Sequence, residues 1–458
     1  MEDALLKYLK YYEKLPGWIK RPIGMLYASL PTKLRHGEFY KQYCKRIKDF
    51  TDHTTPETLQ QKLDQMLFNQ VNMAIEQVPF YRNYPKVKSL EDFQKLPIVS
   101  KSDYLQARDQ FCTADPARRL QVNTGGSSGT PLTFFVEKNV TRPKEKAHFD
   151  WFWGHWGYTP RSRILMLRGK PLANNALFEY QSIKNCLNIS CYELTLENAP
   201  QVLREIKKFR PDFIHGYPSA VKVFTRCAGS EGQKYFSNLK ALFLGSEFLS
   251  DTDRMMFEEY FSAPCCAWYG HTECALHGGT LPGHGSDLVF FPFYGYLELV
   301  DDNGNILTTP GSTGRIVATG FDNSAMPFIR YDTGDLGTWG GMTTVNNCPC
   351  PVLTKIEGRA QDVIYLSDGS EISLTAFIFG QHLKEFDRIR EMQLEQSQPG
   401  KLTLRLVPLQ ELSEADRHNI ADFLDKSVSG RLQTTVEITS HIEKTWRGKH
   451  RFLIQHCK

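Results

Sequence analysis

Two strand-like segments, residues 121–123 and 132–136, are joined by a run of small and hydroxyl-bearing residues. The run consists of Thr124, Gly125, Gly126, Ser127, Ser128, Gly129, Thr130 and Pro131. Small residues allow backbone N–H groups to approach an anion closely, and hydroxyl groups add donors. No Gly-Lys-Ser/Thr triplet follows, so this is not a Walker loop. The run is a candidate phosphate-binding loop, and a tight turn or linker is the alternative interpretation.

The segment Trp268–Glu273 follows an expected strand at 265–268 and carries three residue types that suit a nucleotide and its metal ion. The ring of Tyr269 can stack on a purine, and the hydroxyl of Thr272 can bind a phosphate oxygen. The carboxylate of Glu273 is a ligand of the kind that Mg²⁺ prefers. The alternative is a strand end with an ordinary hydrogen-bonded glutamate.

Three further motifs follow along the chain. Arg330–Asp335 ends in a carboxylate on a turn, which can accept both hydroxyl groups of a ribose. Glu357–Asp362 lies where the composition changes between two regions, and Arg447–Lys449 places a lysine on a glycine-bearing loop. Each motif alone is compatible with a structural role.

An alternation of strand and helix patterns over residues 161–280 must position these motifs. Strands are expected at 164–167, 213–215 and 241–244, and helices at 198–209, at 220–228 and after Ser250. This alternation predicts a parallel or mixed sheet covered by helices. Residues 294–318 instead have the pattern of antiparallel strands around a turn at 302–304.

The chain of 458 residues is too long for one ordinary core, and we expect an α/β fold in three regions. Residues 1–95 should be helical and pack on the main domain, with breaks at Pro16, Pro22, Pro31 and Pro56. Residues 96–358 should form a large multi-layered α/β domain with an antiparallel β subdomain. Residues 359–458 should form a small α+β domain, with a strand pair around Gly400, a helix after Ser413 and a strand at 434–439.

In their order and spacing, the five motifs resemble those of the adenylate-forming superfamily of acyl-CoA ligases, luciferases and peptide-synthetase adenylation domains. More closely, the sequence is similar to the phenylacetate-CoA ligase-like branch and, within it, to the CapK-like proteins of capsule biosynthesis. The resemblance covers residues 90–458. It implies an enzyme that uses ATP to activate a carboxylic acid as an acyl-adenylate and then transfers the acyl group to an amine or thiol.

The resemblance also implies how the nucleotide is held. Residues 124–129 would bind the β- and γ-phosphates of ATP, Tyr269 would stack on the adenine and Asp335 would bind the ribose hydroxyls, with Arg359 close by. The rest of the implied nucleotide site consists of Gly245, Ser246, Glu247 and Gly270.

The same resemblance assigns the catalytic groups. Thr272 would contact the α-phosphate, Glu273 would hold Mg²⁺, and Lys449 would bridge the acid carboxylate and the α-phosphate. Asp362 would be the hinge between an AMP-binding domain, 96–358, and a mobile small domain, 359–458. Neighbouring basic residues compete with Lys449 for its role, which its position after Gly448 favours.

A zinc site is common beside the acyl pocket of this branch, and the sequence retains only part of it. Cys348 and Cys350 form a candidate half-site for Zn²⁺. The positions where a further cysteine and histidine are expected hold Leu281 and Val289, neither of which can bind zinc. Substitutes nearby are Cys274, His277 and His284. Buried reduced thiols are the alternative.

The acid pocket is expected near the aromatic segment 149–158 and after the strand at 213–215. Trp151, His155 and Tyr158 would share one helical face, and His155 and Tyr217 are the candidate pocket residues. Aromatic side chains of a buried core would give the same pattern.

Basic residues are concentrated at the beginning of the chain. Residues 1–50 hold eleven Lys/Arg and five Asp/Glu, a net charge of +6, so the remainder carries 4 − 6 = −2. This pattern fits either a membrane-surface patch or a solvated helical face. The cysteine spacing suggests no disulfide framework, and no signal sequence or transmembrane run is visible. We expect a cytoplasmic protein, with peripheral contact to the inner face of a membrane and no nucleic-acid partner.

Three functions remain open at this point. The first is a ligase with an amine acceptor, in cell-surface polysaccharide biosynthesis, as the CapK-like character favours. The second is a phenylacetate-type aryl acyl-CoA ligase, in which coenzyme A is the acceptor. The third is an inactive nucleotide-binding scaffold, which the joint retention of Thr124, Glu273, Asp335, Arg359 and Lys449 argues against.

Overall fold

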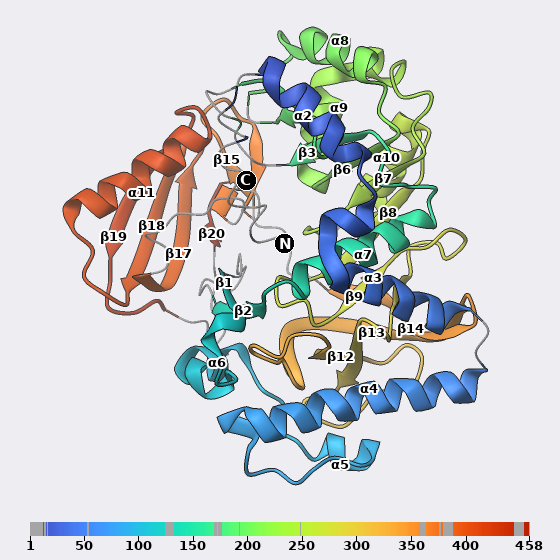
Figure 1. Ribbon diagram of the computed structural model, residues 1–458. Coiled ribbons are helices and arrows are strands. Elements are labelled where there is room, and N and C mark those ends of the chain that lie inside the picture. Colours follow the sequence, from blue (N-terminus) through green and yellow to red (C-terminus); the bar gives the residue numbers. More distant parts are fainter. Residues whose placement is uncertain are drawn as a thin grey trace.

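The computed structural model describes most of the chain (Figure 1). The described ranges are 17–52, 55–123, 132–168, 176–191, 193–247, 249–357, 363–374, 388–443 and 453–457, with the single residues 12, 15, 172, 377 and 378.

One twelve-stranded sheet organises the main part of the molecule, in the order β11-β12-β13-β14-β10-β9-β8-β7-β6-β3-β5-β4. Its parallel half contains β3 (Ile164–Arg168), β5 (Cys186–Ser190), β6 (Phe213–Gly216), β7 (Ala241–Leu244) and β8 (Cys265–Gly270), with β4 (Phe178–Gln181) antiparallel at its edge. Its antiparallel half contains β9 (His277–Gly279), β10 (Leu288–Phe290), β11 (Gly295–Val300), β12 (Thr313–Gly320), β13 (Tyr331–Val345) and β14 (Cys348–Glu357). The expected α/β fold with an antiparallel subdomain is confirmed.

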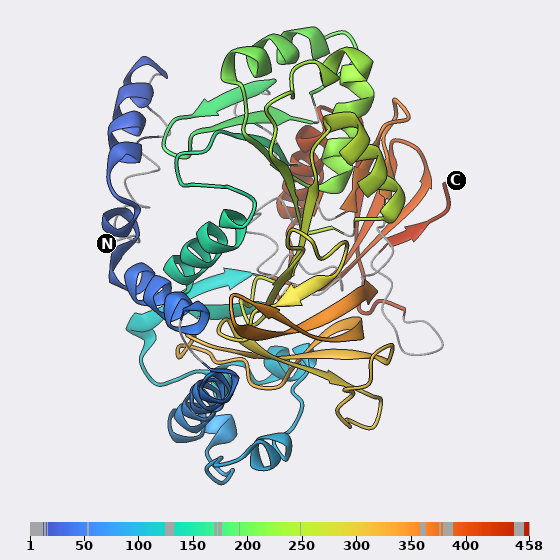
Figure 2. The ribbon, with the colours of Figure 1, turned by 90° about the vertical axis from the view of Figure 1, so that its right-hand side faces the viewer.

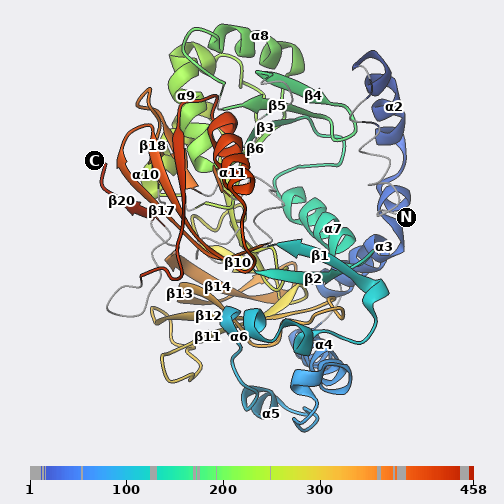
Figure 3. The same ribbon diagram turned by 90° about the vertical axis from the view of Figure 1, so that its left-hand side faces the viewer.

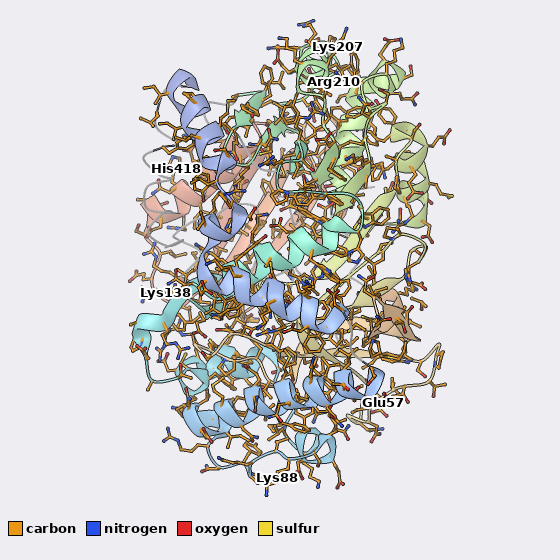
Figure 4. The ribbon with its side chains drawn as sticks, turned by 45° about the vertical axis from the view of Figure 1, so that its right-hand side comes forward. Glu57, Lys88, Lys138, Lys207, Arg210 and His418 are labelled. Carbon is orange, nitrogen blue, oxygen red and sulfur yellow. The ribbon has the colours of Figure 1, made fainter. Side chains whose placement is uncertain are left out.

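Three helices cover one face of the parallel half: α8 (Ala199–Phe209), α9 (Pro218–Gln233) and α10 (Asp251–Phe261). Helix α8 buries Val202, Leu203 and Ile206 against the strands, while Lys207 and Arg210 point outward (Figure 4). Helix α10 begins where expected, because the side chain of Ser250 accepts a hydrogen bond from the backbone of Asp253. These local patterns predicted β3, β6, β7, β8 and the three helices, whereas β4 and β5 were missed.

The opposite face carries α7 (Thr141–Gly154) and α3 (Thr32–Thr51), which pack into an aromatic core. The expectation that Trp151, His155 and Tyr158 share a helical face is wrong in part, because α7 ends at Gly154. His155 caps that end, and Tyr158 lies in the following turn, where its backbone donates to the carbonyl oxygen of Trp153. Gly157, with φ 78°, turns the chain out of the helix.

Helix α2 (Gly17–Ser29) lies against the β4–β5 turn of the parallel half, where the hydroxyl of Ser182 donates a hydrogen bond to the carbonyl oxygen of Lys20. The other N-terminal elements join the antiparallel half. They are α4 (Pro56–Gln77), α5 (Leu90–Gln94), α6 (Lys101–Gln106), the 3₁₀ turns η1 (Pro79–Tyr81), η2 (Arg108–Phe111) and η3 (Pro116–Arg118), and the hairpin β1 (Arg119–Asn123) and β2 (Thr133–Glu137). Helices α4 and α6 contribute to the core formed by β11–β14. The break expected at Pro22 is wrong: Pro22 lies inside α2 on an exposed face, and the rest of the helix continues around the one lost backbone hydrogen bond.

The C-terminal region has a core of its own, at the left in Figure 1. Its four-stranded sheet has the order β19-β18-β17-β20, formed by β17 (Ile389–Gln398), β18 (Lys401–Pro408), β19 (Gln433–Ile438) and β20 (Leu453–Gln455). Helix α11 (Glu414–Ser427) connects β18 to the parallel strand β19 and begins after Ser413, as expected, with a capping box formed by Ser413 and Asp416. A small hairpin, β15 (Val363–Tyr365) and β16 (Glu371–Ser373), joins this core. No helix among the described residues is long and apolar enough to span a bilayer.

Candidate active site

Strand β8 is where the two halves of the large sheet meet. It runs parallel to β7 on one side and antiparallel to β9 on the other, where Tyr269 pairs with Gly278 and Gly270 with His277. Residues 271–273 follow at the carboxyl end of the parallel strands, which is the usual location of ligand sites in such sheets. The motif Trp268–Glu273 therefore lies at a position suited to binding.

Tyr269 and Asp335 meet at this end of the sheet, although they come from different motifs. The hydroxyl of Tyr269 donates a 2.9 Å hydrogen bond to Oδ2 of Asp335, on β13. Burial, together with the negative charge of Asp335, raises the pKa of Tyr269 well above its usual value. The backbone of Asp335 is held in turn by the hydroxyl of Thr333. The phenol remains a neutral donor that orients the carboxylate.

Glu273 lies beside this pair and is almost completely buried, with 7% of its surface exposed. Its Oε1 accepts a 2.9 Å hydrogen bond from the hydroxyl of Tyr331, and its Oε2 lies 3.5 Å from Nδ1 of His271. The side chain of Thr272 is exposed next to it. A buried carboxylate and an accessible hydroxyl are hard oxygen donors, and Mg²⁺ is commonly bound by one carboxylate together with substrate phosphates. These residues fit Mg²⁺.

The segment Gly245-Ser246-Glu247 follows β7 and contacts two neighbouring elements. A Cβ at Gly245 would lie 2.2 Å from the indole of Trp268, so only glycine allows this packing. Ser246 adopts a positive φ of 65°, which turns the chain after the strand. The carboxylate of Glu247 accepts 2.9 Å hydrogen bonds from the backbone and hydroxyl of Ser219, at the beginning of α9. The carboxylate thus anchors the N-terminus of α9 beside the site.

The two candidate acid-pocket residues lie at different places. Tyr217 immediately precedes α9 and packs against both the parallel-sheet core and the C-terminal core. His155 is half-buried at the end of α7, with Nδ1 3.2 Å from the carbonyl oxygens of Trp151 and Phe152. A cavity of about 250 Å³ adjoins Ser219 between α9 and the β15–β16 hairpin, and Arg226 and Arg431 line it.

Cys348 and Cys350 lie buried on β14, in the same apolar cluster as Leu281 and Val289. The thiol of Cys350 lies 3.4 Å from the carbonyl oxygen of Cys348. Within the described residues, no group of three or more His, Cys, Asp or Glu side chains is arranged to hold a metal ion. The side chains of Leu281 and Val289 occupy the positions where two zinc ligands were expected, and neither can bind a metal ion. The described residues therefore do not fit Zn²⁺.

Sequence reasoning missed a buried polar group beneath the site. Nε2 of His148, on α7, lies 2.9 Å from Nδ1 of His277, on β9, and no described residue bonds Nε2 of His277. Next to them, buried Lys144 donates 2.8 Å hydrogen bonds to the carbonyl oxygens of Tyr294 and Phe321. These partners are more than a hundred residues apart, so no local pattern could reveal them.

The histidine pair predicts acid sensitivity. Burial lowers the pKa of His277 from 6.5 to about 3 and lowers that of His148 well below its usual range. The unfolded chain therefore binds protons at these imidazoles at a pH where the folded chain does not, and stability present above pH 6.5 is lost as the pH falls toward 3. From pH 7 to pH 5 the wild type should lose about 2 kcal/mol more stability than a His277→Gln variant. Urea unfolding at both pH values measures this, and equal losses would contradict it.

Several predicted site residues lie outside the described part of the chain. They are Thr124, Gly125, Gly126, Ser127, Ser128, Gly129, Arg359, Asp362 and Lys449. Their roles stay predictions from the motifs.

Solved structures of a known ligase share the fold of this chain. The chain resembles 2-hydroxyisobutyryl-CoA ligase in the postadenylation state, in complex with R3-HIB-AMP, with a TM-score of 0.55, 17% identity and coverage of 89% of this chain and 91% of that one. It also resembles the same ligase in the thioesterification state with 2-HIB-AMP and CoA, with a TM-score of 0.55, 19% identity and coverage of 97% and 94%. The chain has the fold of the adenylate-forming enzymes, as its motifs predicted.

A curated relative gives the comparison at the level of sequence. The chain is 23% identical over 443 residues to protein CapK of Staphylococcus aureus, covering 93% of this chain and 94% of that protein. The expected resemblance to CapK-like proteins is confirmed. No family model matches the sequence.

Proposed function

We propose that the protein is an ATP-dependent, AMP-forming carboxylate ligase that makes an acyl-adenylate and transfers the acyl group to an amine or thiol. The observation that carries this proposal is the convergence of three motif residues at the end of β8. Tyr269 binds Asp335, and Glu273 lies beside them next to the exposed hydroxyl of Thr272. A ribose-binding carboxylate and a second, buried carboxylate for a metal ion are what adenylation requires.

Adenylation requires a carboxylate to attack the α-phosphorus of ATP, and both groups are anionic. Bound Mg²⁺ would supply positive charge that offsets this repulsion. Glu273 would hold the ion, and Thr272 would contact the α-phosphate. Asp335 would fix the ribose and Tyr269 would border the adenine. By the resemblance, residues 124–129 would bind the outer phosphates and Lys449 would bridge the reacting groups. Arg359 would lie close to the ribose, and Asp362 would be the hinge of the small domain.

The group that accepts the acyl from the adenylate is either an amine or the thiol of coenzyme A. The resemblance to the CapK-like proteins of capsule biosynthesis favours an amine acceptor in cell-surface polysaccharide biosynthesis, and protein CapK is a relative of 23% identity. The second ligase structure contains CoA, which supports the thioester alternative, an acyl-CoA ligase with coenzyme A as cosubstrate. Incubating the adenylating enzyme with candidate amines or with coenzyme A, and analysing the products by mass spectrometry, separates the two forms.

The proposal is tested by ATP–pyrophosphate exchange against a panel of aryl, fatty, amino and uronic acids. Acid-dependent exchange would establish adenylation and identify the substrate class. A complete lack of exchange together with no binding of ATP would replace the proposal with the inactive scaffold.

The packing around Trp268 predicts the size of the acid that the enzyme accepts. Its ring centroid lies 5.3 Å from that of His215, 5.7 Å from that of Phe149 and 5.9 Å from that of Trp153, beside Gly245. These rings fill the space next to the carboxyl ends of β6 and β7, so we expect a small acid. Trp268→Ala should raise the ratio of exchange with large acids to exchange with small acids about tenfold or more.

The matched control for this substitution is Trp339→Ala, which removes a tryptophan from β13 in the other core. It should leave the ratio unchanged. An equal shift in both variants would show that general loosening, and not the removed ring, changes the preference.

The proposal also includes the location of the enzyme in the cell. We expect the enzyme to act in the cytoplasm, with peripheral contact between its basic N-terminal region and the inner face of the membrane.

A further inference from the structure

Exposed apolar side chains gather at one place on the surface. Among the described residues, twelve large apolar side chains are exposed, and five of them fall on α2 or just after it. These five, called here the α2 surface, are Ile23, Met25, Leu26, Leu30 and Leu34. Single exposed apolar residues are ordinary, whereas a contiguous group of them marks an interaction site.

Helix α2 is held to the molecule by its opposite side. Gly24 is buried, and a Cβ there would lie 2.0 Å from Oγ of Ser182, in the β4–β5 turn. The same hydroxyl donates a 3.0 Å hydrogen bond to the carbonyl oxygen of Lys20. Figures 2 and 3 show α2 along an outer edge of the molecule, with no helix or strand of the described residues beyond it. The α2 surface is therefore presented outward by a helix that has a defined attachment.

Positive charge lies along the chain next to this surface. Residues 17–52 hold eight Lys/Arg and three Asp/Glu, a net charge of +5, while the rest of the chain carries 4 − 5 = −1. Lys41, Lys45 and Lys48 are exposed at helical spacing on α3, which continues the outer edge formed by α2 (Figure 2). Apolar side chains and lysines along one edge complement an anionic surface that also has an apolar interior.

We propose that α2 and α3 dock the protein on an anionic lipid bilayer, with the α2 surface inserted among the acyl chains and the lysines of α3 at the headgroups. A helix lying in the interface binds through buried apolar area together with attraction to anionic lipids. Protein interfaces, in contrast, are depleted of lysine at their core. The docking places the enzyme where a membrane-bound acceptor or product is accessible, and it does not depend on the proposed catalysis.

The test is co-sedimentation of the full chain with vesicles of phosphatidylcholine alone or mixed with phosphatidylglycerol. The wild type should bind the mixed vesicles more strongly, and salt should weaken that binding. Met25→Asp and Leu26→Asp should each lower the partition coefficient about tenfold or more, because each removes one inserted apolar side chain.

The matched control is Met255→Asp on α10, since Met255 is 64% exposed and Met25 is 60% exposed. It should bind like the wild type. The proposal is overturned if the wild type ignores anionic vesicles, or if the Met255 variant loses binding equally. It is also overturned if Met25→Asp only converts a dimer to a monomer in size-exclusion chromatography, which would assign the surface to a second copy of the chain. Exchange activity without vesicles should be unchanged in all three variants, so a failure of catalysis and a failure of docking are distinguishable.

Discussion

Glu273→Gln should reduce acid-dependent ATP–pyrophosphate exchange by about 100-fold to 1,000-fold, the usual cost of removing one charge-stabilising group from an active site. The glutamine side chain has the same shape and still offers an oxygen to the hydroxyl of Tyr331, which now bonds Oε1 of Glu273. What is lost is the negative charge that would hold Mg²⁺. The exchange rate, measured at saturating acid across a range of Mg²⁺ concentrations, reports the loss.

Tyr331→Phe is the matched control for this prediction. It removes the hydrogen bond to Glu273 but keeps the charge, so we expect a loss of about tenfold or less. Both variants should unfold at urea concentrations close to that of the wild type. Full exchange activity in Glu273→Gln would remove Glu273 from the proposed mechanism, whatever the result for Tyr331→Phe.

Arg330→Ala should destabilise the protein by about 3–5 kcal/mol, the usual cost of breaking a buried ion pair by removing one partner. Arg330 is 3% exposed and Glu298 is 2% exposed. Arg330 makes 3.0 and 3.2 Å hydrogen bonds to the two carboxylate oxygens of Glu298 and contacts the carbonyl oxygens of Gln94 and Leu96. Without the guanidinium, the buried carboxylate of Glu298 loses its partner. The segment that leads from α5 to the sheet also loses its hydrogen bonds to Arg330. Urea unfolding measures the change.

Two comparisons sharpen this prediction. Lys234→Ala breaks an exposed pair with Glu231 and should change the stability little, because solvent screens an exposed ion pair. The double variant Arg330→Met with Glu298→Leu should recover much of the loss, since no buried charge is left unpaired. A loss in Arg330→Ala no greater than that in Lys234→Ala would contradict the assigned role of the buried pair.

Local sequence patterns predicted the elements that local interactions determine. Strand β7 is a fully buried apolar run, α8 has an apolar stripe, and Ser250 and Ser413 cap their helices, so each was predicted to within a few residues. The three-residue strands β9 and β10 were missed, because His277, Gly278 and Gly279 have no strand pattern and pair only through tertiary context.

For the site as well, the sequence predicted some residues and not others. The motif types identified Tyr269, Glu273 and Asp335, and the structure brings these three together. Their supports could not be predicted, since Tyr331 reaches Glu273, and His148 reaches His277, only after the sheet has formed. Sequence spacing finds residues that carry a chemical group, whereas the residues that orient them depend on the packing of distant segments.

The unbroken hydrogen bonding from β4 to β11 has a thermodynamic consequence. Because β8 pairs with β7 on one side and with β9 on the other, hydrogen bonding continues from the parallel half into the antiparallel half, and we expect the two halves to unfold together. Among the described residues, the C-terminal core shares no strand with that sheet and packs its own apolar residues. We therefore expect the main sheet to be one cooperative unit and the C-terminal core a second, so that a ligand bound at the end of β8 should raise the melting temperature of the first unit.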